Sequence, residues 1–166
     1  KNEIIEHRNY IGGRYSVLSE VGMLPSILMG LNEKKFKSID HLIKNKNFKN
    51  LLIRNVSSIF SLINKKKLNS IILNFDEDSE DLFKWYQQLV AESLGKKTKG
   101  ILPVISNLPR DNHSLMQLYL DGPKNCFYTF FDVFDKSSNK SLQKIKLAQK
   151  KATQIVFKKK NIPFRS

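Results

Sequence analysis

The second half of the chain alternates short apolar runs with longer segments of helical periodicity. The apolar runs, each bounded by polar residues or glycine, are 68–75 (LNSIILNF), 100–106 (GILPVIS) and 126–134 (CFYTFFDVF). Helices are expected between and after these runs, at 76–95, 111–121 and 141–159, and residues 162–166 would begin one more strand. Strands that alternate with helices predict an α/β fold, in which a parallel sheet is covered on both faces and a ligand binds beyond the carboxyl ends of the strands.

The first half of the chain has helical periodicity and no strand-like run. Helices are expected at about 21–31, 33–44 and 47–64, and the polar residues 1–10 are interpreted as a linker. With 166 residues, of which 40% are hydrophobic, the chain is long enough to bury a substantial core. One compact domain over residues 11–166 is therefore the expectation.

The chain carries a large excess of positive charge. Its 29 Lys and Arg residues outweigh its 15 Asp and Glu residues, which gives a formal net charge of +14. Such a charge suits a nucleic acid, a membrane surface or an anionic substrate. The lysines are spread over most of the expected helices, and no aromatic residues are interleaved with the clusters at 65–67 and 158–160. This distribution favours solvated helix faces, so neither a nucleic-acid partner nor a membrane partner is expected.

The single cysteine and the lack of long apolar runs further limit which kinds of protein this chain can be. Cys126 is the only cysteine, which excludes an internal disulfide and a cysteine metal site. His41 has no second histidine or carboxylate at metal-ligand spacing, so no metal is expected. No apolar run approaches the ~20 residues of a membrane-spanning helix, and the first residues lack the pattern of a signal peptide. A soluble protein of the cytoplasm is the expectation.

A carboxylate and an imidazole stand out between residues 85 and 122. Glu92 lies near the end of a helix that begins among acidic residues and closes at Gly95 with an expected left-handed cap. His113 lies in the first turn of the next helix, for which Asp111 is the expected N-cap. The two side chains are a candidate base and a candidate acid. Taken alone, Glu92 would more often be a solvated carboxylate, and His113 is as readily a capping or packing residue.

A Gly-Gly-Arg turn precedes the first expected helix. Gly12 and Gly13 allow close backbone approach or a positive φ, and Arg14 follows directly. Backbone N–H groups and a guanidinium that converge at a helix start suit a phosphate or an oxyanion. Spacing alone makes this a weak signal, and Arg14 could instead form an ion pair with an acid such as Glu20.

Three segments resemble the phosphoglucose isomerase family. Residues 11–22 (IGGRYSVLSEVG) resemble its Gly-Gly-Arg-(Phe/Tyr)-Ser segment, with Glu20 departing from the small residue or proline usual there. Residues 87–97 (QQLVAESLGKK) resemble its catalytic-glutamate segment, through Glu92, Ser93, Gly95 and Lys96. Residues 107–123 (NLPRDNHSLMQLYLDGP) resemble the short bacterial branch around its histidine, here His113. The three matches stand in the family's order and span most of the chain from Ile11 to Phe134.

The resemblance implies a fold, an active site and a partner. The family's second half is a sugar isomerase (SIS) domain, a Rossmann-like three-layer α/β/α sandwich with a parallel sheet. Glu92 would be the base that moves a proton between C1 and C2, and Arg14 would stabilise the enediolate. His113 would open the sugar ring from the partner subunit, which implies a homodimer. Gly13 and Gln88 would contact the sugar phosphate, and no cofactor or metal is required.

The resemblance also implies an activity for the whole protein. That activity is the interconversion of glucose 6-phosphate and fructose 6-phosphate through an enediol, a step of glycolysis and gluconeogenesis. Residues 1–10 would be a linker from a missing N-terminal domain, and residues 11–166 a second SIS domain truncated at its C-terminus. The chain alone is expected to be inactive. The alternatives are a basic module that binds polyanions or nucleic acid, and a SIS domain that senses sugar phosphates without catalysis.

Overall fold

The chain forms two compact units, Lys1–Ser57 and Ser58–Ser166, in a computed structural model that describes residues 3–134 and 140–166. The boundary between the units falls inside the long helix α4 (Lys46–Asn64). Of the expected linker, residues 3–10 form no helix or strand, and residues 1–2 lie outside the described part of the chain.

The first unit consists of short helices. Its elements are the 3₁₀ helix η1 (Gly13–Leu18), α1 (Glu20–Leu28), α2 (Glu33–Lys37), α3 (Asp40–Lys44) and the first part of α4. The single helix expected over 33–44 is two helices. Asparagine side chains cap the N-termini of α2 and α4. Asn32 Oδ1 accepts from the Lys34 N–H at 2.9 Å, and Asn45 Oδ1 accepts from the Asn47 N–H at 2.9 Å. Each satisfies a backbone donor that the first turn of a helix leaves open.

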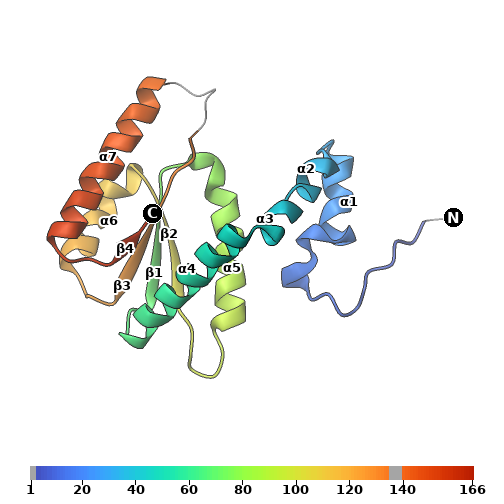
Figure 1. Ribbon diagram of the computed structural model, residues 1–166, viewed down its shortest axis with the longest axis horizontal. Helices are drawn as coiled ribbons and strands as arrows, with labels where there is room; N and C mark the ends of the chain where they lie inside the picture. The colour runs from blue at the N-terminus through green and yellow to red at the C-terminus, as the bar shows by residue number, and fades with distance from the viewer. Residues whose placement is uncertain (1–2, 135–139) are drawn as a thin grey trace. The chain divides into compact units, whose positions relative to one another are not determined.

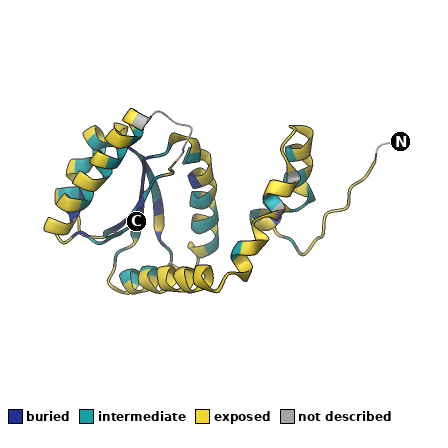
Figure 2. Cartoon of the chain, turned by 45° about the horizontal axis from the view of Figure 1, so that its top comes forward, coloured by how far each residue is buried: buried dark blue, intermediate teal, exposed yellow. Residues whose placement is uncertain are grey.

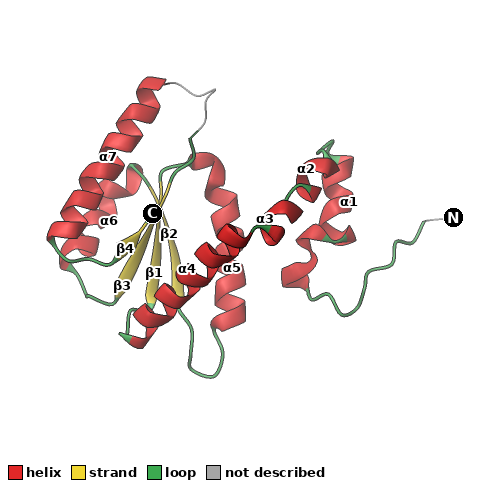
Figure 3. Cartoon of the chain, in the orientation of Figure 1, coloured by secondary structure: helices red, strands yellow, loops and turns green. Residues whose placement is uncertain are grey.

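The second unit is built on a four-stranded parallel sheet (Figure 1; Figure 3). Its strands are β1 (Asn69–Asn74), β2 (Leu102–Asn107), β3 (Cys126–Phe131) and β4 (Phe164–Arg165). They lie in the order β2-β1-β3-β4, so β1 is central and pairs in register with both β2 and β3. The strands expected from the apolar runs are confirmed.

Helices cover both faces of this sheet (Figure 2). They are η2 (Glu77–Ser79), α5 (Glu80–Leu94), α6 (Arg110–Asp121) and α7 (Lys140–Lys159). On the α5 face, Phe83 meets Phe131 edge to face with ring centroids 4.7 Å apart. On the opposite face, Phe157 of α7 meets Tyr128 in the same way at 4.8 Å. The predicted three-layer α/β/α sandwich is confirmed for this unit.

The core lies between the sheet and the α6–α7 layer. It draws on alternate residues of the two central strands, because successive strand side chains point to opposite faces. The buried members are Ile71, Leu73, Phe75, Leu108, Tyr119, Tyr128, Phe130, Phe157 and Ile162. Leu73 and Phe157 are fully buried. Removal of this apolar surface from water is the main favourable contribution to folding of the unit.

Two predicted helix ends differ from the structure. Gly95 has φ −75° and ψ 63°, which is an inverse γ-turn closed by the Lys96 N–H on the Leu94 carbonyl at 2.8 Å. The left-handed cap expected at Gly95 was therefore wrong. Helix α6 begins at Arg110 with Pro109 at the N-cap position, so Asp111 is not the N-cap. The Asp111 carboxylate instead accepts from the Asn107 N–H at 2.8 Å and ties the helix to the end of β2.

Candidate active site

Glu92 lies in the last turn of α5 with its side chain exposed. The amide of Gln88, one turn earlier, donates from Nε2 to Glu92 Oε1 at 2.9 Å. The helix is anchored to the sheet by the neighbouring residue Gln87, whose Nε2 donates to the Pro103 carbonyl at 2.7 Å. Gln87 thus faces β2, while Gln88 and Glu92 form an exposed pair on the helix. The structure brings together these two predicted site residues.

His113 is the fourth residue of α6 and is exposed. Its helix is held by a polar network at the carboxyl ends of β1 and β2. The Asn74 amide donates to Asn107 Oδ1 at 3.2 Å, and the Leu108 N–H donates to the Asn74 carbonyl at 2.7 Å. Asn74 is almost fully buried, so the start of α6 is fixed by a satisfied buried amide.

Glu92 and His113 lie at opposite ends of the parallel strands. Helix α5 leaves the carboxyl end of β1 and runs back toward the amino end of β2 (Figure 1). Glu92, in the last turn of α5, therefore lies at the amino ends of the strands. Helix α6 begins shortly after β2 ends, which places His113 at the carboxyl ends of the strands. A base and an acid on one unit therefore do not converge. The delivery of His113 from a partner subunit stays a prediction.

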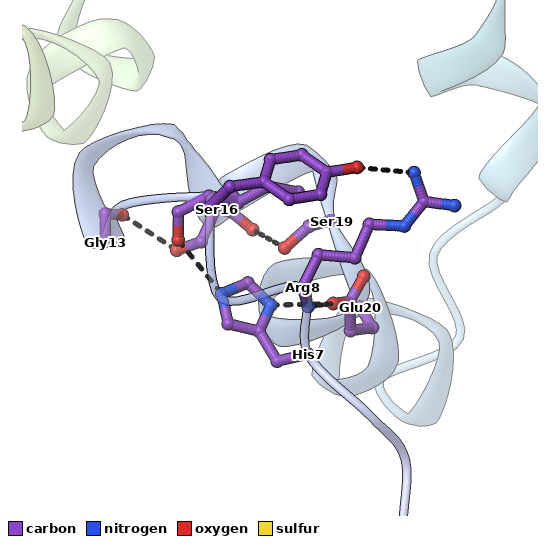
Figure 4. Close-up of polar contacts among 8 residues, drawn as sticks. His7, Arg8, Gly13, Ser16, Ser19 and Glu20 are labelled. Atoms are coloured by element: carbon purple, nitrogen blue, oxygen red, sulfur yellow. Dashed lines mark hydrogen bonds and ion pairs between the residues drawn. The ribbon is translucent and has the colours of Figure 1, made fainter.

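Arg14 is the second residue of η1, in the first unit. The turn before it is closed by the Tyr15 N–H on the Gly12 carbonyl at 2.9 Å, and the Ser16 hydroxyl donates to the Gly13 carbonyl at 2.7 Å (Figure 4). Gly12 has φ −66°, and Gly13 is not among the glycines with positive φ, so the turn does not need glycine for a left-handed conformation. Around both glycines the space is open, since a Cβ added at either would meet nothing within 4 Å.

Glu20 is held by the segment that precedes the turn. His7 Nδ1 lies 2.6 Å from Glu20 Oε1, and the Arg8 N–H donates to the same oxygen at 3.2 Å. Hydrogen bonds from its own backbone and then from His7 lower the pKa of the Glu20 carboxyl. The sequence suggested Arg14 as the ionic partner of Glu20 and gave no indication of His7. The separation of 13 residues carries no local pattern that would have revealed the pair.

The part of the chain that the structure describes contains neither a cluster of metal-binding side chains nor a membrane-spanning helix. Within residues 3–134 and 140–166, no three His, Cys, Asp or Glu side chains are placed to hold a metal ion together. Over the same residues, every helix is too short or too polar to cross a bilayer.

Comparison with known proteins identifies the family. Residues 1–108 match the family model described as phosphoglucose isomerase. The chain belongs to the phosphoglucose isomerase family. The matched region contains Arg14, Gln88 and Glu92, whereas His113 lies beyond it. The predicted membership of this family is confirmed.

Several relatives carry the name glucose-6-phosphate isomerase. The protein of Methanocaldococcus jannaschii is 30% identical over 92% of this chain, and that of Streptococcus pyogenes is 34% identical over 78%. A probable glucose-6-phosphate isomerase of Methanococcus maripaludis is 38% identical over 74%. The chain spans 43%, 30% and 29% of these three phosphoglucose isomerase relatives, which is less than half of each.

A solved structure shares the fold. A hypothetical protein of Thermus thermophilus matches 94% of this chain and 43% of its own, with a TM-score of 0.70 and 19% identity.

Proposed function

We propose that this chain supplies part of the active site of a glucose-6-phosphate isomerase, with Glu92 as the base of an aldose-ketose isomerisation. The observation that carries the proposal is the Gln88–Glu92 pair, an exposed carboxylate fixed by an amide inside the region that matches the family. The relatives' names support the substrate class, which is a hexose 6-phosphate.

Glu92 would move a proton between C1 and C2. Isomerisation needs a proton removed from the carbon next to a carbonyl, and a carboxylate held against that carbon can accept it and return it to the neighbouring carbon. The hydrogen bond from Gln88 fixes the direction of one carboxylate oxygen. A base with a fixed geometry removes much of the entropic cost of reaching the transition state.

Arg14 would stabilise the negative charge that develops on the substrate oxygen. A guanidinium keeps its proton at any physiological pH and offers several donors in a rigid plane. The open space around Gly12 and Gly13 supports this role, because a substrate could approach the backbone there without meeting a side chain. A fixed cation aimed at the enediolate lowers the barrier most when water is excluded.

His113 would open the hexose ring, since an imidazole can gain or lose a proton near neutrality. His113 lies at the carboxyl ends of the strands, away from Glu92, and this position supports a role in the active site of a second copy. We therefore propose a homodimer in which each subunit lends its histidine to the other.

The remaining parts of the site would come from regions that the relatives have and that this chain does not span. The 166-residue chain alone is accordingly expected to show little or no turnover. Robust turnover by the purified chain would contradict this part of the proposal.

A chimaera tests the function. Residues 1–166 would replace the matching segment of the Methanocaldococcus jannaschii enzyme, and fructose 6-phosphate formation from glucose 6-phosphate would be measured. Turnover that is lost in Glu92→Gln and kept in the matched surface control Glu3→Gln is expected. A chimaera that folds and binds glucose 6-phosphate without converting it would instead favour a sugar-phosphate sensor.

A further inference from the structure

His7 joins two parts of the first unit through both nitrogens of its ring (Figure 4). Nδ1 lies 2.6 Å from Glu20 Oε1, at the first residue of α1. Nε2 lies 3.1 Å from the carbonyl oxygen of Ile11, the residue directly before Gly12. The ring therefore bridges the start of a helix and the start of the Gly-Gly-Arg turn.

The chemistry of the two partners defines the state of this ring. A carboxylate oxygen and a carbonyl oxygen are both acceptors, so each ring nitrogen must carry a hydrogen to make its bond. Both bonds form together only when the ring carries both hydrogens, and the contact of Nδ1 with Glu20 is then an ion pair. With 33% of the His7 side chain and 29% of the Glu20 side chain exposed, the pair is partly shielded from water.

The bridge between His7 and Glu20, together with neighbouring contacts, forms a clamp that holds the start of the Gly-Gly-Arg turn against α1. Arg8 donates its backbone N–H to Glu20 Oε1 at 3.2 Å and accepts from the Ile11 N–H at 2.9 Å. The segment from His7 to Ile11 is thereby closed on itself and fastened to α1. Its other charged group, the Arg8 guanidinium, donates to the Tyr10 hydroxyl at 2.7 Å and so is directed to Tyr10.

The Gly-Gly turn needs such support. Gly12 and Gly13 have no side chains to pack, and no neighbour within 4 Å would restrain a Cβ at either position. Glycine also has the largest backbone freedom of any residue, so the conformation of the turn depends on hydrogen bonds to its backbone.

We propose that His7 and Glu20 are positioning residues that hold Arg14 in its active direction through the carbonyl of Ile11. This proposal rests on the proposed role of Arg14 in stabilising the enediolate. In this proposal neither the His7 nor the Glu20 side chain touches the substrate.

Hydrogen exchange on the 166-residue chain tests the clamp without any assay of activity. The amide protons of Ile11 and Tyr15 report on the turn because both are hydrogen-bonded there. Glu20→Gln keeps an acceptor oxygen and removes the charge, and should speed their exchange about twofold to fivefold. Glu20→Asp, which restores the charge, should recover part of the protection, and the exposed control Glu3→Gln should change nothing. Unchanged exchange in both Glu20→Gln and His7→Gln would overturn the clamp.

The chimaera tests the positioning role. If the clamp orients Arg14, Glu20→Gln should lower kcat about tenfold with little change in KM. The reason is that a wrongly oriented guanidinium loses its interaction with the substrate chiefly in the transition state. Glu20→Asp should restore part of kcat. An active chimaera whose kcat is the same in Glu20→Gln would refute positioning while leaving the proposed function intact. An inactive parent chimaera would count against the proposed function, and the exchange experiment would still decide on the clamp.

Discussion

At the scale of single residues, the buried tyrosines of the second unit predict a loss of stability at alkaline pH. The Tyr128 hydroxyl donates to the Tyr119 carbonyl at 3.3 Å inside the core. Burial raises the pKa of both tyrosines above the ordinary 10.0. The unfolded chain therefore releases these protons first, so the tyrosine contribution to stability is complete below about pH 10 and falls as the pH rises above it.

Urea unfolding between about pH 8 and pH 11, which brackets the ordinary tyrosine pKa, measures this effect. Tyr128→Phe should cost about 1 kcal/mol near neutrality through the lost hydrogen bond, and should make the alkaline decline shallower. An equally steep decline in Tyr128→Phe would mean that Tyr128 does not titrate as its burial requires.

The residues of the site differ in how far sequence can reveal them. Gln88 and Glu92 are four positions apart in a helix, so their contact follows from helical spacing. His7 and Glu20 are 13 positions apart, and only the folded turn brings them together. Sequence patterns thus reveal contacts within an element better than contacts between a helix and an irregular segment.

At the scale of elements, Gly22 determines how closely η1 and α1 pack. A Cβ added to Gly22 would lie 2.1 Å from the carbonyl oxygen of Val17, so a side chain would push the two helices apart. Gly22→Ala should expose the η1 backbone and speed tryptic cleavage after Arg14. Gly12→Ala, where the space is open and φ is −66°, serves as the control that should leave cleavage unchanged. Equal cleavage of both variants would contradict close packing at Gly22.

The central strand predicts the largest core effect. Leu73 lies in β1 between β2 and β3 and is fully buried, whereas Leu82 on α5 is 50% exposed. Leu73→Ala should lower the free energy of unfolding by about 2–5 kcal/mol through lost burial and the cavity left behind. Leu82→Ala should cost far less in the same urea titration. Similar costs for the two variants would mean that β1 is not the centre of the core.

Elements were predicted more accurately than their ends. The strands stood out because parallel strands are buried on both faces and appear as continuous apolar runs. The helix ends did not: a γ-turn closes α5, and the Asp111 side chain bonds back to Asn107 rather than capping α6. These ends depend on the path of the following loop, which no local pattern specifies.

At the scale of the whole molecule, the fold class and the family were predictable from the sequence. The boundary within α4 is invisible in the sequence because helical periodicity continues through it.

Transfer of deuterium from C2 of glucose 6-phosphate tests the central claim, that Glu92 moves this proton. With the chimaera and substrate deuterated at C2, part of the label should appear at C1 of fructose 6-phosphate and the rest in water. Glu92→Gln should lower turnover about 10²-fold to 10⁴-fold while the circular dichroism of the protein stays unchanged. Turnover and label transfer within about threefold of the parent chimaera in a folded Glu92→Gln variant would contradict the account.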